Sequence, residues 1–140
     1  MLQNEVKDML DKAIQDNYCF ACGKDNPIGM HLDFHIEGKT FKAVHTVLPE
    51  YQSYEGVVHG GIITTMLDEA MGGYLCAQGQ RVVTARIDVR YRAITPVGVP
   101  LTITSQIKSQ RGRFIEMVGT IALPNGTITA EGTAKMAVVE

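Results

Sequence analysis

One stretch in the middle of the chain, from His59 to Gln78, arranges its apolar and polar residues with a helical period. Apolar residues recur in pairs about every four positions, at Ile62, Ile63, Met66, Leu67, Ala70, Met71, Tyr74 and Leu75. This pattern predicts a helix that is apolar over about half of its surface and mostly buried. Gly79 comes directly after this stretch, where a glycine can end a helix in the left-handed conformation.

Shorter periodic stretches on both sides predict one more helix and six strands. Apolar residues at helical spacing over residues 2–16 predict a short amphipathic helix. Alternation with a period of two predicts strands at 31–36, 40–48, 81–95, from 101 to the turn at 111–113, at 114–123 and at 127–139. An antiparallel sheet wrapped around the central helix buries both apolar faces. We therefore expect the α+β class and a single domain over residues 1–140.

The central helix has two internal glycines, Gly72 and Gly73, on the less apolar side that also carries Asp68. Each glycine costs roughly 1 kcal/mol against alanine inside a helix. They are explained if a ligand or a second chain approaches the helix closely there. A second chain on this face predicts a homodimer, and the dimers could pair into a homotetramer.

Composition narrows the class of protein. The chain has 140 residues and a net charge of −2, which gives no indication of nucleic-acid binding. No apolar run approaches the roughly 20 residues of a membrane span, and the first ten residues lack the apolar core of a signal peptide. We therefore expect a cytoplasmic protein with no membrane partner. Three cysteines, an odd number, do not form a disulfide framework.

The start of the central helix has the residues for acyl chemistry. A helix N-terminus presents unpaired amides and a partial positive charge. Gly60 and Gly61 would let a carbonyl oxygen approach these amides, where a developing oxyanion is stabilised. Asp68 lies two turns further along and could attack a thioester or activate a water. Its neighbour Glu69 is expected to be a solvated carboxylate.

These residues resemble the hotdog-fold acyl-CoA thioesterases. The resemblance rests on HGGIITTMLDEAMG, with Asp68 nine residues after His59, and on the following strand TARIDVRYRAITPVG. It is closest to the phenylacetate-degradation branch, with the human thioesterase-superfamily members and one type of 4-hydroxybenzoyl-CoA thioesterase. It implies a hotdog fold, with a sheet of about six strands around the central helix. It also implies two subunits that join their sheets and share two active sites.

The resemblance implies roles for further residues. Gly60 matches the glycine whose amide binds the thioester oxygen, and His59 would hold the loop and the substrate. Ser53 stands where relatives carry Asn or Gln, so this sequence departs from the pattern, although neighbouring Gln52 could substitute. Thr84 matches a Ser or Thr that acts from the adjacent subunit. The alternation of residues 81–95 instead places Thr84 on the solvent side, and both possibilities remain open.

Basic residues are candidates for binding the phosphates of coenzyme A. They form one group on a strand face, with Arg86, Arg90 and Arg92, and another around a turn, with Lys108, Arg111 and Arg113. Arginine side chains suit phosphate oxygens. The turn is the better candidate, because charges on a strand face are usually only solvated.

A zinc site is the other hypothesis that the sequence raises. Cys19 and Cys22 have the spacing of zinc ligands, and His31 and His35 follow. In a strand these two histidines lie about 13 Å apart, too far for one ion. The stretch CFACGKDNPIG is also similar to a structural segment in a subset of the family. We therefore expect no metal and no cofactor, with coenzyme A only as part of the substrate.

The sequence thus predicts a thioester hydrolase that converts an acyl- or aryl-CoA to the free acid and coenzyme A. Asp68 would be nucleophile or general base, and the Gly60 amide would polarise the carbonyl. The alternative is a hotdog module that binds acyl-CoA without catalysis, since fold alone does not decide function. The acyl group is left open.

Overall fold

The computed structural model describes residues 3–139, and the side chains of all of these except residues 10–16. Two helices and six strands follow the predicted order, with a short 3₁₀ turn, η1 (Pro49–Tyr51), before the central helix. The helices are α1 (Gln3–Asp16) and α2 (Gly60–Ala77). The strands are β1 (His35–Glu37), β2 (Thr40–Thr46), β3 (Val82–Tyr91), β4 (Pro100–Arg111), β5 (Phe114–Ala122) and β6 (Ile128–Val138).

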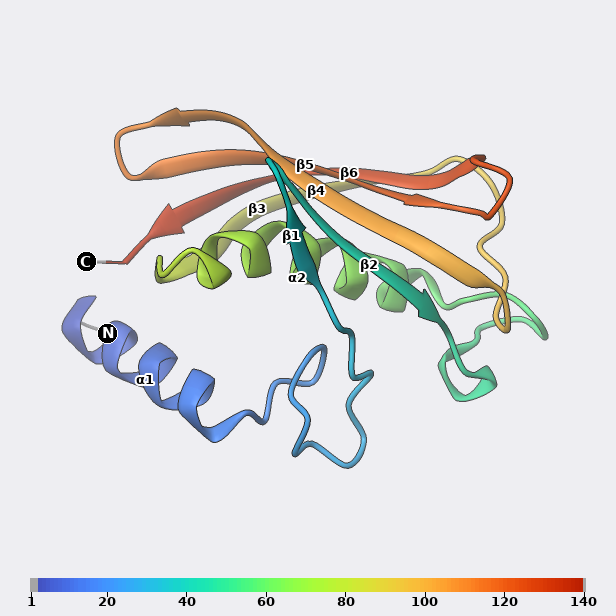
Figure 1. The fold of residues 1–140 in the computed structure, drawn as a ribbon, viewed down its shortest axis with the longest axis horizontal. Helices are drawn as coiled ribbons and strands as arrows, with labels where there is room; N and C mark the ends of the chain where they lie inside the picture. The colour runs from blue at the N-terminus through green and yellow to red at the C-terminus, as the bar shows by residue number, and fades with distance from the viewer. Residues whose placement is uncertain (1–2, 140) are drawn as a thin grey trace.

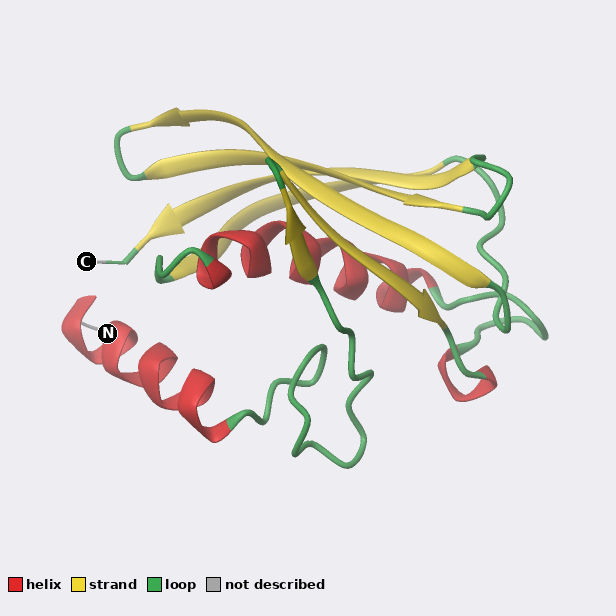
Figure 2. Cartoon of the chain, in the orientation of Figure 1, coloured by secondary structure: helices red, strands yellow, loops and turns green. Residues whose placement is uncertain are grey.

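The six strands form one antiparallel sheet in the order β1-β2-β4-β5-β6-β3. Figures 1 and 2 show this sheet as a curved layer, with α2 lying against one of its faces. The two layers share one core because the apolar side of α2 meets the inward side chains of the strands. Its largest fully buried residues are Met66, Leu67, Met71 and Leu75 of α2, with Leu101, Ile103, Ile115, Met117, Ile121 and Met136 of the sheet. The predicted hotdog fold is confirmed.

Both ends of α2 lie close to their predicted positions. The ring of His59 caps the first turn, since its Nδ1 accepts a hydrogen bond of 2.9 Å from the Gly61 amide. At the other end, Gly79 is left-handed with φ 89°. The Gln80 amide donates to the Leu75 carbonyl, which closes the last turn. The chain leaves the helix here and enters β3.

The prediction of a strand over residues 31–36 is wrong for residues 31–34. His31 is left-handed with φ 58°, and β1 begins only at His35. The Met30 and Leu32 amides donate to the carbonyls of Phe20 and Ala21, both at 2.8 Å. This segment therefore pairs with the preceding loop instead of joining the sheet, which alternation alone does not reveal.

The predicted strand over 81–95 contains an irregularity that its alternation does not show. The pairing register between β3 and β6 shifts between Thr84 and Arg86. Such a bulge reverses the faces on one side of it. Val82 packs against the core and Val83 is 39% exposed, whereas uninterrupted alternation with Ile87 and Val89 would place Val83 on the core face.

The two glycines inside α2 have an explanation within this chain. A Cβ on Gly73 would come within 3.2 Å of the Phe41 ring, so β2 occupies the space that a side chain would need. A Cβ on Gly72 would meet Met136 of β6 at an ordinary 3.6 Å. The close approach at Gly73 is thus made by the protein's own sheet. No second chain is needed to explain it, and the homodimer stays a prediction.

None of the helices described over residues 3–139 combines the length and the apolar character of a membrane span.

Candidate active site

The first turn of α2 leaves one amide available. His59 accepts from three successive amides: Gly61 on its ring nitrogen, and Ile62 and Ile63 on its carbonyl. The Gly60 amide has no acceptor among residues 3–139. It is a helix-terminal donor of the kind that binds anions and polarised carbonyls. Of the two glycines predicted to contact substrate, Gly60 therefore offers a free amide and Gly61 does not.

Tyr91 holds this end of the helix against the sheet. Its hydroxyl lies 2.9 Å from the Gly60 carbonyl, to which it donates, and 2.9 Å from Thr64 Oγ1. Alternation along the strand puts Tyr91 in line with Ile87 and Val89, so sequence reasoning did not identify this role. The signals that could have indicated it were its position at the end of β3 and its residue type, since tyrosine combines an apolar ring with a polar tip.

The side chain of Asp68, in the middle of α2, contacts the side chain of Thr84 on β3. Thr84 Oγ1 donates a hydrogen bond of 2.7 Å to Asp68 Oδ1, and it also lies 3.6 Å from the sulfur of Met136. The bulge in β3 turns Thr84 to the helix side of the sheet, where its side chain contacts Asp68 and is still exposed. This contact is made within one chain. It orients the Asp68 carboxylate and satisfies one of its oxygens.

A cavity of about 390 Å³ begins at this pair. Asp68 and Thr84 form part of its wall, and Gly72, Gly73 and Met136 continue it along the helix. The opposite side is built by the loop after α1, through Cys19 and Cys22. The carboxylate therefore faces a space large enough for part of a small acyl ligand.

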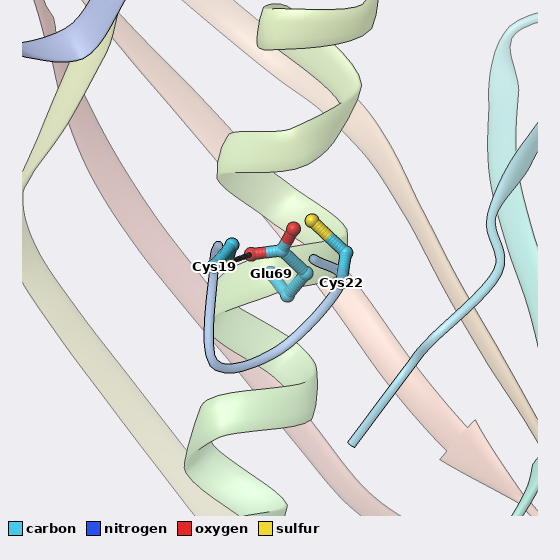
Figure 3. Close-up of side chains that lie close together, drawn as sticks. All are labelled: Cys19, Cys22 and Glu69. Carbon is cyan, nitrogen blue, oxygen red and sulfur yellow. Dashed lines mark hydrogen bonds between the residues drawn. The ribbon is translucent and has the colours of Figure 1, made fainter. Parts of the chain in front are cut away.

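Glu69 is not the solvated carboxylate that the sequence predicts. It is partly buried, because the loop after α1 folds over it and brings Cys19 and Cys22 to its side chain (Figure 3). The Cys19 thiol donates a long hydrogen bond of 3.9 Å to Glu69 Oε2. Burial raises the pKa of Glu69 to about 7, and the negative Asp68 and Cys19 add to this.

The two thiols of this loop influence each other. A hydrogen bond with Cys22 lowers the pKa of Cys19 to about 5. The same bond, together with burial, raises the pKa of Cys22. The sequence identified the pair by its spacing but could not identify the helix carboxylate that lies beside it.

The histidines of the zinc hypothesis lie elsewhere. His31 Nε2 is 2.9 Å from the Asn26 carbonyl. His35 is on β1, where its Nε2 lies 3.5 Å from a Glu37 oxygen. Neither belongs to the group formed by Cys19, Cys22 and Glu69. The four residues of the zinc hypothesis therefore do not form one site.

Ser53 and Gln52 lie in the loop before α2. Both are exposed. The Ser53 amide donates to the Val57 carbonyl, and Gln52 Oε1 accepts from the Gly56 amide at 3.1 Å. Gln52 is thus used to close this loop. Ser53 has no side-chain hydrogen bond among the described residues, so its hydroxyl is available.

The candidate phosphate ligands are exposed at two places. Arg111 ends β4 and Arg113 precedes β5, so both flank the turn between these strands. The guanidinium of Arg113 lies over the Phe114 ring, 5.3 Å from its centre. In Figure 1 this turn is at the end of the molecule where α2 terminates, opposite the helix start. Arg90 lies on β3, on the sheet surface beside Glu131.

Gly60 and Asp68 of one chain cannot act on the same carbonyl group. They belong to one helix, and eight residues of helix span about 12 Å along its axis.

The central and C-terminal part of the sequence matches a known family. The sequence model of the thioesterase superfamily matches residues 55–130, from the loop before α2 into β6. The chain belongs to the thioesterase superfamily. The matched part contains the helix start, Asp68 and Thr84.

Solved structures with the same fold include several members of this superfamily. One thioesterase superfamily protein has a TM-score of 0.81 and 25% identity, and the match covers 86% of this chain and 60% of that one. The chain thus spans 60% of the length of that relative. The E. coli PaaI protein from the phenylacetic acid degradation operon has a TM-score of 0.76 and 18% identity, with 96% and 98% covered. It agrees in fold with the branch that the sequence resembles.

A third relative was solved with coenzyme A. This hypothetical thioesterase from Streptococcus pneumoniae has a TM-score of 0.71 and 21% identity, and the match covers 76% of this chain and 84% of that one. Two further structures of the same protein carry alanine in place of an aspartate and of a threonine.

Proposed function

We propose that this protein hydrolyses acyl- or aryl-CoA thioesters to the free acid and coenzyme A. The observation that carries the proposal is the Asp68 carboxylate, oriented by Thr84 at 2.7 Å, at the wall of a 390 Å³ cavity. A carboxylate held in this way is suited to attack a thioester carbon or to take a proton from water. A solvated surface aspartate would have neither the partner nor the cavity.

The Gly60 amide is the proposed oxyanion donor. It is the one amide of residues 60–63 without an acceptor, and the helix terminus adds a partial positive charge. Loss of one such donor typically slows an enzyme by about 10² to 10³-fold. The separation of Gly60 from Asp68 along one helix supports a homodimer in which each site combines Asp68 of one chain with Gly60 of the other.

The spacing of two polar residues in a relative supports the same assignment. The aspartate and threonine replaced in the S. pneumoniae protein stand 16 residues apart, the separation of Asp68 and Thr84. Coenzyme A in that relative supports a CoA thioester as the substrate class. His59 acts in this proposal through its cap on the first turn, which holds the Gly60 amide in place.

The test is a hydrolysis screen over aryl- and alkyl-CoA esters that follows the released thiol. Asp68→Asn keeps the size of the side chain and can still accept the hydrogen bond of Thr84, so it should fold normally. It should lower kcat by about 10²-fold or more, the scale of a lost general base. Asp88→Asn is the matched control, because Asp88 is an exposed strand carboxylate paired with Arg86, and should keep activity within about twofold.

Near-wild-type hydrolysis by Asp68→Asn would rule out this residue as the catalytic carboxylate. Binding of acyl-CoA without turnover of any ester in the wild-type protein would instead favour the binding-module alternative.

A further inference from the structure

The loop after α1 and the helix α2 bring three metal-binding side chains together. The sulfurs of Cys19 and Cys22 and a carboxylate oxygen of Glu69 all lie within 4.8 Å of one another. Figure 3 shows the loop crossing α2 with both cysteines on the side of the Glu69 carboxylate. Glu69 follows Cys19 by 50 positions in the chain, so the tertiary structure alone brings the carboxylate to the two cysteines.

Backbone hydrogen bonds hold the two sulfurs in place. The Gly23 amide donates to the Cys19 carbonyl at 2.8 Å, which closes a tight turn around the Cys-x-x-Cys segment. A Cβ on Gly23 would lie only 2.3 Å from the Cys19 backbone nitrogen, so no other residue fits there. Metal-binding Cys-x-x-Cys turns need this kind of fixed geometry, because both sulfurs must face one point.

Further contacts anchor the same loop at its far end. The Asn26 side chain donates to the Tyr18 carbonyl at 3.2 Å and accepts from the Ile28 amide at 3.0 Å. The Tyr51 hydroxyl donates to the Gly29 carbonyl at 3.1 Å. The loop therefore has a defined shape before any ligand binds, which lowers the entropy cost of binding one.

The chemistry of the three donors selects the ion. We propose that Cys19, Cys22 and Glu69 bind a zinc ion. Two thiolates favour zinc over calcium and magnesium, which prefer oxygen ligands, and a carboxylate oxygen is a common third ligand. The sulfurs of a zinc-bound pair lie about 2.3 Å from the metal, which requires only a small contraction of the observed group. Binding requires both sulfurs as thiolates and releases to solvent only the protons that the ligands still carry, and nothing is oxidised.

Three protein ligands leave one position of a tetrahedral zinc ion for water or another ligand. The cluster lines the same cavity as Asp68, so this position is within reach of whatever enters the cavity. A bound ion would also tie the loop to α2 next to Asp68. The zinc site does not depend on the proposed hydrolysis, and its test below measures binding directly.

The experiment measures metal uptake by the full chain after its thiols have been reduced with a phosphine. Zinc is added in competition with a chromophoric chelator, and cobalt is added in a parallel sample. We expect one zinc per chain with Kd below about 1 μM, and a sulfur-to-cobalt charge-transfer band. Cys19→Ser, Cys22→Ser and Glu69→Gln should each weaken zinc binding by more than about 100-fold, because even second-shell changes cost about 10 to 100-fold.

Cys76→Ser is the matched control. Cys76 lines the same cavity from the same helix as Glu69 but lies outside the cluster, so its removal should leave Kd within about threefold. The proposal is overturned if the reduced wild-type protein binds no zinc or cobalt when the metal is present at about 0.1 mM. This concentration is far above the Kd of protein zinc sites. Equal loss in Cys76→Ser would also overturn it. If a cysteine variant fails to fold, the sulfur-to-cobalt band of the wild-type protein is the test: its presence supports the site and its absence overturns it.

Discussion

Thr84 Oγ1 donates a 2.7 Å hydrogen bond to Asp68 Oδ1, and it can do so only because β3 is bulged beside it. The bulge turns the threonine from the solvent side of the strand to the helix side. The proposed catalytic carboxylate therefore depends on an irregularity of the neighbouring strand for its orientation.

This contact predicts that Thr84 is a positioning residue. A hydrogen bond to a charged group contributes about 1.5–3 kcal/mol, so Thr84→Val should lower kcat by about 10 to 100-fold. KM should change less than about threefold, because the hydroxyl touches the carboxylate and not the substrate. Thr84→Ser restores the hydroxyl and should recover most of the rate. Equal losses in both variants, measured by steady-state kinetics, would contradict the assignment.

A mixing experiment tests whether two chains share each site. Gly60→Pro removes the amide hydrogen at the first helical position, where proline is well tolerated, and the extended His59 backbone suits a following proline. Asp68→Asn and Gly60→Pro chains should each be inactive alone. Unfolded together and refolded at equal concentration, they should recover about one quarter of wild-type activity, because half of the dimers are mixed and each has one intact site.

The mixture is informative only if both variants fold and assemble, which circular dichroism and sedimentation check. A mixture that stays inactive under these conditions excludes the shared site. An active 15.3 kDa monomer at micromolar concentration excludes it independently.

The turn between β4 and β5 is predicted to bind the phosphates of coenzyme A. Changing Arg111 and Arg113 together to Ala should raise KM for acyl-CoA and leave kcat nearly unchanged, since remote contacts act equally on ground and transition states. Arg90→Ala, on the sheet surface, tests the alternative basic group in the same assay. The double substitution should leave the KM of a truncated pantetheine thioester unchanged, because this substrate lacks the nucleotide. An equal rise in KM for this substrate would show that the arginines act in another way.

His45 predicts how stability depends on pH. Burial lowers the pKa of His45 below its ordinary 6.5. Below pH 6.5 the unfolded chain therefore binds a proton that the folded chain does not, so the unfolding free energy should fall as pH falls. The slope from this residue is at most about 1.4 kcal/mol per pH unit. This decrease in the unfolding free energy stops once the pH is below the pKa of His45 in the folded protein.

The measurement compares urea unfolding of the wild-type protein and His45→Gln from pH 8 to 5.5. Glu69, with its raised pKa, acts in the opposite direction: its contribution to stability falls as pH rises from about 4.5 to 7. It is present in both proteins and cancels in the difference. A difference that does not change below pH 6.5 would show that His45 is not desolvated.

Local patterns in the sequence determined the elements and the motif residues. The helical period over His59 to Gln78, followed by Gly79, is a property of neighbouring residues, and α2 ends where it predicts. The HGG stretch and Asp68 could be assigned to the helix because helical spacing fixes their separation. Most of the strands followed from alternation in the same way, and with them the α+β class. The hotdog fold was implied by the resemblance of the motif residues to a known family.

The tertiary structure decided which remote groups meet. Thr84 faces Asp68 because of a bulge, and one extra residue reverses a period of two without changing the composition of the strand. Glu69 meets Cys19 across 50 residues because the loop folds over α2, and Tyr91 reaches Gly60 through the position of β3 beside the helix. Alternation and periodicity report the faces of one element. The pairing of faces from distant elements depends on sheet register and loop docking, which are set by the packing of the whole chain.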